Sequence, residues 1–515
     1  MDWGSVADRA GEGVDFMKFI LVVLTFILFI LCLQINIPNN PGQIPDSVNF
    51  YQNIHRVYLG IFLVAAAMIY FYINRRKPRP ESAPKLSPHI LLAILCAGFI
   101  LRILIAVTIP GHPYDIQAFI QWSAAASKNL WGIYTDNMIP PYYTLTYPPV
   151  YLYVLGLIGT IARFFLISSH TLYIVMLKLP AIIADVATGY LLYRFSKQYV
   201  TQSFRLLIAG LYIFNPVTLF NSALWGQVDA FFTLFIITGL LLIHSNRLPW
   251  AAVLFTLAVL FKPQGVFVLP VLFWELWRRK KFSLFLWSGL AGLVTLVTVL
   301  LPFSTAGGPF WIVDQYIKTA KQFPMATVNA YNLYTLFGAN FHYDSNNFLL
   351  FTYYTWGTIF ILGLLGLGTY LYWKAGRRDR DQESAASDTT SNGLPFLNAM
   401  LLSVGIFVLA TRMHERYLFP ALTTGLFTFI LYPDRRLLYL FGGLTVTHYL
   451  TISRIFFEAF HGNKYTTDWM VYLVAFVNVI LLIYLIHISL DIIKRAVHAK
   501  GKPGIPKAGK AGAAR

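Results

Sequence analysis

Charged residues are scarce in this chain: Asp, Glu, Lys and Arg make up only 12% of its 515 residues, and 22 residues are acidic. Hydrophobic residues make up 57% of the chain. Apolar runs recur from one end to the other, and many can cross the ~30 Å hydrocarbon core of a bilayer. This composition excludes a set of soluble domains and predicts an all-α, polytopic membrane protein.

Cysteine is rare as well. The two cysteines, Cys32 and Cys96, both lie inside apolar runs, so the sequence offers no disulfide framework. The first apolar run, residues 16–35, has an acidic flank and lacks a small-residue cleavage site. We therefore expect a retained membrane helix there and not a signal peptide. The inverted internal repeat that many transporters carry is also lacking.

Basic residues are abundant by contrast, and the formal net charge is +18. Lys and Arg occur in short clusters between apolar runs, which is typical of cytoplasmic loops and not of a nucleic-acid-binding surface. We predict about fourteen crossings of the cytoplasmic membrane, with both termini cytoplasmic. The predicted spans are 16–35, 57–73, 89–109, 178–194, 206–222, 229–244, 250–262, 264–277, 283–303, 351–374, 396–411, 417–432, 437–453 and 469–490.

The apolar run 149–167 is the exception. If it crossed the membrane, the basic cluster 194–205 would lie outside, and every later basic cluster would be inverted. The positive-inside rule therefore predicts that this run lies in, or dips into, the outer interface. The same rule places several loops on the outer side: 110–177, 225–229, 262–264, 304–350, 412–416 and 454–468.

Asp115 is the first acid after the run 89–109, which stops abruptly at Pro110. Its carboxylate could cap a helix, hold an ion or act as a general base that takes a proton from an acceptor hydroxyl. Pro110 and Pro113 would make the backbone that holds it rigid. Asp115 is therefore the main candidate for a functional residue on the predicted outer face.

Asp229 is a second outer acid, at the end of the turn Trp225-Gly-Gln-Val-Asp229. This turn is either a plain interfacial turn or a site in which Gln227 and Asp229 contact sugar or acceptor hydroxyls. Asp229 could also bind a divalent ion. Asn332, in the outer loop 304–350, is a further candidate for such contacts, unless that loop forms an amphipathic interfacial helix.

The segment Arg412-Met-His-Glu-Arg416 places four titratable groups within five residues, between two apolar runs. Such a cluster is costly at a membrane unless it lines a polar site. Either Glu415 neutralises one arginine in an interfacial knot, or Arg412, His414 and Arg416 bind a phosphate and Glu415 orients them.

Lys262 lies at the tip of a hairpin whose two apolar runs each rise only about 20 Å. The tip should lie below the outer surface, in a protein-lined pocket. A lysine there needs an anionic partner, either a carboxylate of the protein or a ligand phosphate, and Lys262 is a fourth candidate phosphate ligand. Arg102 and Asp185 lie inside apolar runs, and we expect them to form a structural ion pair.

In order and spacing these motifs resemble those of the GT-C superfamily of integral membrane glycosyltransferases. The nearest likeness is to the bacterial GPI-mannosyltransferase-like group, which is related to the protein O-mannosyltransferases. The resemblance covers roughly residues 90–450. Its motifs are Asp115, Tyr147-Pro-Pro-Val-Tyr-Leu-Tyr153, Lys178-Leu-Pro-Ala-Ile-Ile-Ala-Asp185, Asn215-Pro216, Ala223-Leu-Trp-Gly-Gln-Val-Asp229, Lys262-Pro-Gln264, Val328-Asn-Ala-Tyr-Asn332 and Thr411-Arg-Met-His-Glu-Arg-Tyr-Leu-Phe-Pro420.

The resemblance implies inverting transfer of a sugar, with a mannose-like hexose favoured, from a polyprenyl-phosphate donor at the outer face. It makes Asp115 the catalytic base. The lone Asp229 stands where an Asp-x-Asp pair would favour a metal, so a divalent cation is disfavoured and no other cofactor is expected. The acceptor stays open between a lipid, a glycan and a protein.

The resemblance also suggests a division of the chain. Two helices and a basic loop (1–88) precede a catalytic module (89–303), an outer loop (304–350), the C-terminal helices with the Arg412–Arg416 motif (351–493) and a basic tail (494–515). Two other functions fit the sequence. A flippase or secondary transporter of lipid-linked glycans would use Arg102 and Asp185 as working charges, and an O-antigen-type polymerase would use a lipid pyrophosphate donor.

Overall fold

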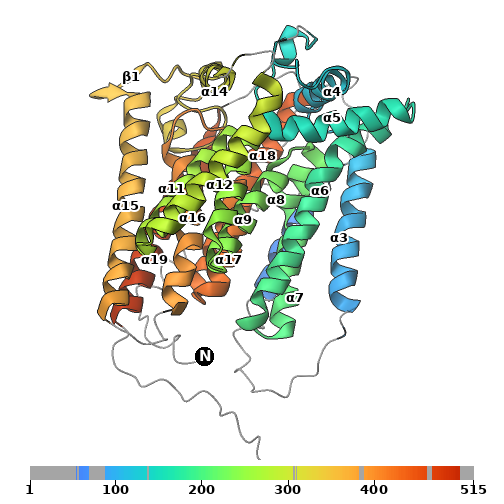
Figure 1. Ribbon diagram of the computed structural model, residues 1–515. Coiled ribbons are helices and arrows are strands. Elements are labelled where there is room, and N and C mark those ends of the chain that lie inside the picture. The colour runs from blue at the N-terminus through green and yellow to red at the C-terminus, as the bar shows by residue number, and fades with distance from the viewer. Residues whose placement is uncertain are drawn as a thin grey trace, which may run out of the picture.

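The structure is a computed structural model. It describes residues 51, 54, 57–68, 87, 89–135, 138–304, 308, 310–381, 388–460 and 467–498. The described residues are almost all helical, as Figure 1 shows. One short antiparallel hairpin, β1 (Asn347–Phe348) and β2 (Phe351–Thr352), pairs Asn347 with Thr352 in the outer loop. The predicted all-α class is confirmed.

Most of the helices follow one another with short connections, and the longer connections lie between α4 and α5 and between α14 and α15. The α-helices are α3 (His89–Thr108), α4 (Pro113–Lys128), α5 (Pro149–Phe164), α6 (His170–Phe195), α7 (Gln202–Ile213), α8 (Pro216–Leu219), α9 (Asp229–His244), α10 (Leu248–Phe261), α11 (Leu269–Arg279), α12 (Phe282–Leu300), α14 (Trp311–Gln322), α15 (Tyr353–Asp381), α16 (Asp388–Leu409), α17 (Phe419–Leu431), α18 (Arg435–Phe460) and α19 (Trp469–His498). Short 3-10 helices are η1 (Pro141–Tyr143), η2 (Ser196–Gln198), η4 (Pro263–Val268), η5 (Leu301–Phe303) and η6 (Leu333–Phe337), and η3 (Phe220–Trp225) is a π-helix.

Five helices among the described residues are long and apolar enough to cross a membrane. They are His89–Thr108, His170–Gln198, Phe282–Phe303, Tyr353–Gly376 and Trp469–Arg495. The pair Gln202–Ile213 and Pro216–Trp225, bent by 43°, would be a sixth span if it crosses as one broken helix. Fourteen crossings therefore stay a prediction, and the run 16–35 lies outside the described residues.

Helix α5 lies across one end of the bundle beside α4, whereas α6 runs along the bundle (Figure 1). It has 16 residues, so it rises only about 24 Å, less than the hydrocarbon thickness. It begins at Pro149, where proline is tolerated because the first N–H of a helix has no intrahelical partner. This placement agrees with the prediction that the run 149–167 does not cross.

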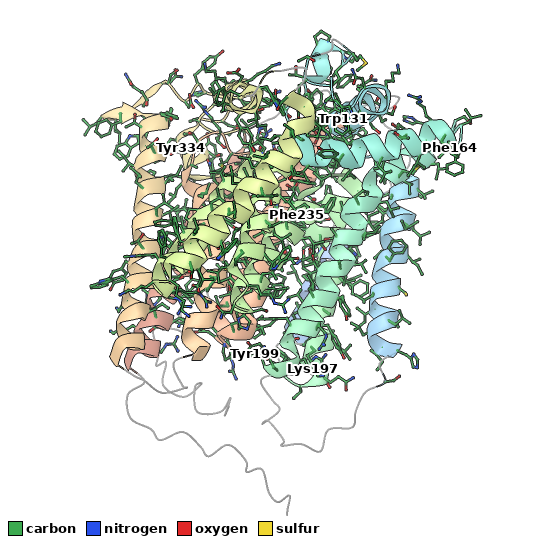
Figure 2. All side chains as sticks on the ribbon, in the orientation of Figure 1. Trp131, Phe164, Lys197, Tyr199, Phe235 and Tyr334 are labelled. Carbon is green, nitrogen blue, oxygen red and sulfur yellow. The ribbon has the colours of Figure 1, made fainter. Side chains whose placement is uncertain are left out.

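Contacts between helix ends place two of the basic loops that the structure describes, 194–205 and 278–281, at the other end of the bundle. The Tyr199 hydroxyl lies 3.0 Å from His244 Nε2. Arg279 Nη2 donates to the carbonyl of Ile243, the neighbour of His244. Figure 2 shows Tyr199 at the end opposite to Trp131, which lies between α4 and α5. The basic end and the Asp115 end are thus opposite, as the positive-inside argument requires.

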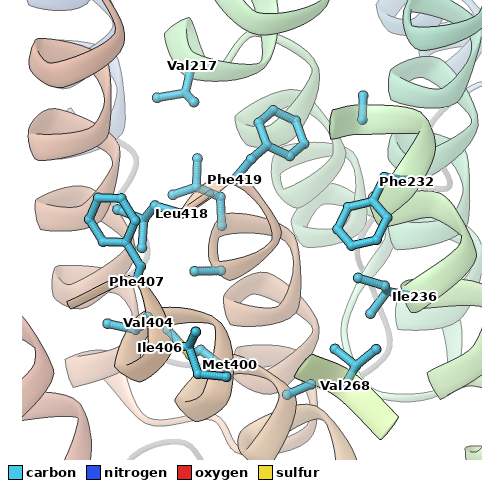
Figure 3. Close-up of a cluster of buried hydrophobic side chains, with 14 of the residues drawn as sticks. Val217, Phe232, Ile236, Val268, Met400, Val404, Ile406, Phe407, Leu418 and Phe419 are labelled. Atoms are coloured by element: carbon cyan, nitrogen blue, oxygen red, sulfur yellow. The ribbon is translucent and has the colours of Figure 1, made fainter. Parts of the chain in front are cut away.

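The interior between α9, α16 and α17 is filled by apolar side chains (Figure 3). Phe232 and Ile236 of α9 face Ile406 of α16 and Phe419 of α17, and all four are at most 4% exposed. Helix association in a membrane depends on close packing, because lipid tails are as apolar as the helices. The packing of these side chains therefore contributes to placing the ends of these helices, which carry the polar residues.

The expected ion pair between Arg102 and Asp185 is confirmed. Arg102 Nε donates to Asp185 Oδ2 at 3.1 Å, and both side chains are fully buried. Their remaining hydrogen-bonding groups are matched by Gly98, Ile213, Thr218, Tyr212 and Ser222. The pair joins α3 to α6, α7 and the α8–η3 segment, so it acts as a structural tie between helices.

Replacing Arg102 with Met should destabilise the protein by about 3–5 kcal/mol, because Asp185 would remain buried without its cation. The measurement is thermal or denaturant unfolding of the purified protein in detergent. The double variant Arg102→Met with Asp185→Leu is the matched control and should recover much of the loss, because it buries no unpaired charge. A double variant as unstable as the single one would contradict the ion-pair interpretation.

Candidate active site

A cavity of about 970 Å³ opens at the end of the bundle that carries α4 and α5. Its walls come from the start of α4, the loop before α5, the α10–η4 turn, α14, the outer end of α15 and the segment after α16. Segments far apart in the sequence thus meet around one space. Six of the predicted site residues line it: Asp115, Lys262, Arg412, His414, Glu415 and Arg416.

The backbone before Asp115 is docked on the turn that follows η3. His112 N donates to the carbonyl of Trp225 at 2.9 Å, and His112 Nδ1 accepts from Asp115 N to cap α4. Gly111 has φ 101°, and a Cβ there would lie 2.7 Å from the Trp225 carbonyl oxygen. Only glycine permits this approach without strain. The abrupt end of the apolar run at Pro110 and Gly111 therefore serves to place Asp115 against Trp225.

The Asp115 carboxylate is held by one of its two oxygens. Oδ2 accepts from Trp225 Nε1 at 2.7 Å and from Gln227 Nε2 at 2.6 Å, and Arg416 Nη1 lies 3.8 Å from the same atom. Among the residues that the structure describes, no hydrogen bond reaches Oδ1. Asp115 therefore presents one anchored oxygen to the protein and one unoccupied oxygen at the cavity.

The surroundings keep Asp115 ionised. Burial alone would raise the pKa of its carboxyl, but Arg416, His112 and the hydrogen bonds from Trp225 and Gln227 outweigh burial and hold that pKa well below its usual range. Burial alone would lower the pKa of Arg416. The neighbouring carboxylates Asp115 and Glu415 outweigh burial, so the pKa of Arg416 is raised. The two groups stabilise each other as ions.

Lys178 belongs to one of the sequence motifs, but the sequence assigns it no role. In the structure its side chain lies beside the turn that contains Trp225. Its Nζ donates to the carbonyls of Ile109 at 2.7 Å and Ala223 at 2.8 Å, so it ties the end of α3 to η3. Gly226, with φ 85°, ends η3 against Ile116 of α4. Ala223 lies in the last turn of η3, where main-chain carbonyls have no partner within the helix, and Lys178 donates to its carbonyl instead.

Lys262 and Asp229 form a buried ion pair. Nζ lies 2.5 Å from Asp229 Oδ1, and Asn221 Nδ2 donates to Oδ2 at 3.1 Å. Of the two anionic partners that the sequence allowed for Lys262, this structure supplies the carboxylate. Among the described residues there is no cluster of three or more His, Cys, Asp and Glu side chains suited to hold a metal. The charge of Asp229 is matched by a lysine.

The three basic residues of the Arg412–Arg416 segment have different surroundings, and their binding of a phosphate stays a prediction. Arg412 Nε donates to Asp344 Oδ2 at 2.6 Å, at the mouth of the cavity. Burial and the nearby Arg416 lower the pKa of His414 to about 3, so His414 is neutral. Glu415 Oε1 accepts from Arg416 Nη1 at 2.6 Å, so the predicted orienting contact is present.

Asn332 and Gln227 are placed differently from the expectation as well. Asn332 is fully buried, caps η6 and donates weakly to the Phe407 and Ala410 carbonyls at the end of α16. It ties the outer loop to the bundle and does not line the cavity, so the structure gives it a structural role in place of a sugar contact. Gln227 does not line the cavity either, and its side-chain amide donates to Asp115 Oδ2.

The cavity, the ionised carboxylate and the apolar helices define a membrane protein with an anionic catalytic candidate at one end of its bundle. The sequence matches the family model of glycosyltransferase family 87 over residues 145–404, which is half of the chain. The chain therefore belongs to glycosyltransferase family 87, and it is a GT-C-like membrane glycosyltransferase. A comparison with curated proteins found no match.

The matched range contains Trp225, Gln227 and Lys262 but neither Asp115 nor Arg416. In the folded chain these two residues contact the matched part directly, through the hydrogen bonds of Trp225 and Gln227 to Asp115 and the 3.8 Å approach of Arg416. The match names no sugar and no mannosyltransferase group.

We expect Arg416→Gln to raise the pKa of Asp115, because it removes the strongest of the effects that lower it. In the native protein Asp115 should stay ionised below the ordinary aspartate pKa of ~3.9, whereas in the variant it should take up a proton at a higher pH than in the native protein. The measurement is the infrared carbonyl stretch of protonated carboxyl groups during acid titration. Asp115→Asn in each background assigns the band. Identical titrations of Asp115 with and without Arg416 would contradict the assignment.

Proposed function

We propose that this protein transfers a sugar, with a mannose-like hexose favoured, from a polyprenyl-phosphate donor to an acceptor hydroxyl, with inversion at the anomeric carbon. The reaction would take place at the outer face of the cytoplasmic membrane, with both termini cytoplasmic. The observation that carries the proposal is the Asp115 carboxylate. The residue lines a large cavity, its Oδ2 is held by Trp225 and Gln227, and among the described residues its Oδ1 accepts no hydrogen bond.

Asp115 acts as the general base of the transfer. The acceptor oxygen attacks the anomeric carbon from the face opposite to the phosphate, and its proton passes to Asp115 Oδ1. The bond between that carbon and the phosphate oxygen breaks, and the polyprenyl phosphate leaves with the electron pair. The proton moves to the carboxylate as the new bond forms, because the attacking oxygen then becomes acidic. Trp225 and Gln227 keep the base oriented.

Arg416 and Lys262 are the cations that would stabilise the leaving phosphate. Arg416 Nε is buried and has no hydrogen-bond partner among the described residues, so it can donate to a ligand oxygen. Its 3.8 Å approach to Asp115 is longer than its 2.6 Å contact with Glu415, so a phosphate would compete with Asp115 first. Arg412 at the mouth and neutral His414, which still has one N–H to donate, are further phosphate contacts in this proposal.

The cavity wall supports a donor attached to a lipid. Val266 and Phe267 of η4 and Ile361 of α15 line it on the side of the bundle, and Val266 is 46% exposed. Helix α15 belongs to the helices that can cross the membrane. A polyprenyl chain can therefore lie against these apolar side chains while its phosphate reaches Arg416.

Asp115→Asn should reduce the rate of sugar transfer by about 10²–10⁴-fold, because the amide cannot accept the acceptor proton. The measurement is transfer of a radiolabelled mannose from polyprenyl phosphate to a panel of acceptors by the protein in nanodiscs. The control is Asp314→Asn, which removes an exposed carboxylate of α14 and should leave the rate unchanged. Turnover of Asp115→Asn near the native rate would rule out the base assignment. NMR of the product tests inversion.

Arg416→Ala should weaken the binding of polyprenyl-phosphate mannose by about 1.5–3 kcal/mol, the usual contribution of a hydrogen bond to a charged group. Donor affinity is measured by equilibrium binding to the protein in nanodiscs. Lys318→Ala removes an exposed cation of α14 that does not line the cavity, and it is the matched control. Equal donor affinities for Arg416→Ala and the native protein would mean that Arg416 does not bind the phosphate.

A further inference from the structure

Three tyrosines form one wall of the cavity next to Asp115. The ring centroids of Tyr114 and Tyr142 lie 5.4 Å apart, those of Tyr114 and Tyr143 lie 5.7 Å apart, and those of Tyr142 and Tyr143 lie 5.0 Å apart. All three line the cavity. We call this cluster the tyrosine platform. Tyr114 precedes Asp115 in α4, so the platform begins one residue from the proposed base.

The platform lies apart from the cations of the site. Lys262 Nζ lies 5.6 Å from the centroid of the Tyr147 ring and 5.8 Å from that of Tyr417, and the Arg416 guanidinium lies 6.0 Å from that of Trp225. No such contact with a cation is found for the platform among the described residues. The cavity therefore has a cationic side and an uncharged aromatic side, and Asp115 lies near Arg416 and next to Tyr114 in the chain.

The platform is held in place by its backbone. Residues Tyr142 and Tyr143 belong to η1, which is capped by Pro140 and begins at Pro141, and the two prolines restrict the main chain. Trp122 Nε1 donates to the Tyr143 carbonyl at 2.8 Å, and the Tyr114 hydroxyl donates to the Tyr142 carbonyl at 3.0 Å. A surface that is ordered before binding loses little conformational entropy when a ligand arrives.

The side chains of the platform remain available to a ligand. Tyr142 is 70% exposed, and Figure 1 shows the loop between α4 and α5 standing above both helices. Among the described residues, the Tyr142 and Tyr143 hydroxyls have no hydrogen-bond partner. The platform thus combines aromatic faces, free phenol hydroxyls and no charge. Tyrosine commonly serves such sites because it has an apolar body and a polar end.

This combination matches one class of acceptor. A pyranose ring presents C–H groups that pack on an aromatic face and hydroxyls that bond to phenols. An acyl chain would leave the phenol hydroxyls unmatched, since it has no hydrogen-bonding groups. A charged headgroup would be favoured at the cationic side instead, near Lys262 and Arg416. An uncharged sugar satisfies both parts of the platform at once.

We infer that the tyrosine platform binds an uncharged sugar of the acceptor, which makes the acceptor a glycan and the reaction the extension of a glycan by one residue. This inference rests on the proposed glycosyl transfer. A preceding reaction must then supply a glycan with a free hydroxyl at the outer face. The new glycosidic bond forms between that hydroxyl oxygen and the anomeric carbon of the donor. The bond from that carbon to the phosphate oxygen breaks, polyprenyl phosphate leaves with the electron pair, and Asp115 receives the proton.

The test uses the full chain in nanodiscs with polyprenyl-phosphate mannose and three acceptors: methyl mannobioside, a threonine-rich peptide and a diacylglycerol. The disaccharide should be the accepted substrate. Tyr142→Ala should raise its KM by about tenfold and leave kcat within about twofold, because ground-state binding is lost while the base is untouched. Tyr142→Phe keeps the ring and should show a smaller rise. Phe310→Ala removes a 76% exposed aromatic of the outer loop that lies outside the cavity, and it should change neither constant.

A second measurement does not depend on turnover. Saturation-transfer NMR should detect methyl mannobioside bound to the Asp115→Asn protein, and Tyr142→Ala should remove the signal. Transfer to the peptide or the diacylglycerol and not to the disaccharide would overturn the inference, and so would an unchanged KM or NMR signal in Tyr142→Ala. If no acceptor is labelled but NMR binding still depends on Tyr142, the proposed donor reaction fails while the sugar platform stands.

Discussion

The anchoring of one carboxylate oxygen is the interaction on which the arrangement of this site depends. Trp225 and Gln227 hold Asp115 Oδ2, and the same turn accepts the His112 N–H through the Trp225 carbonyl. These contacts join α4 to the end of η3, so the geometry of the base is set by two segments more than 100 residues apart. The positive φ of Gly111 and Gly226 and the close packing of Ile116 leave this junction little freedom.

Every charge that the structure buries in the helical bundle near the site is matched by a specific partner. Arg102 pairs with Asp185 inside the bundle, and Lys262 pairs with Asp229 beneath the cavity. Lys178 differs because its two partners are main-chain carbonyls. Buried pairs of this kind add little stability over apolar residues of the same size, but they penalise any other arrangement of the helices. In this chain they fix the relative positions of α3, α6, η3 and the α9–η4 contact, and these elements carry the site.

The sequence predicted the features that depend on composition and on charge along the chain. The all-α class and the pairing of Arg102 with Asp185 follow from hydropathy and the cost of burying charge. The interfacial position of the run 149–167 stays a prediction of the positive-inside rule, with which the placement of α5 across one end of the bundle agrees. Partners across space could not be predicted. The Arg412–Arg416 motif looked like one cluster, because nothing in the sequence shows that Asp344 lies beside Arg412. Asn332 looked like a ligand contact, but its side chain is used for capping, which polar residues do equally well.

The pairing of the cations constrains how a phosphate can bind. Arg416 and Lys262 already face Asp115, Glu415 and Asp229, so three carboxylates surround two cations in this structure. An arriving phosphate must compete with one of these carboxylates. Asp115 has the longest contact with Arg416 and is the easiest to displace from it. Once the phosphate draws Arg416 away, the effect that most lowers the pKa of Asp115 weakens, and the carboxylate becomes a stronger base. Donor binding would thereby increase the basicity of Asp115 at the moment when a proton has to be removed, and without a donor the base stays weak toward water.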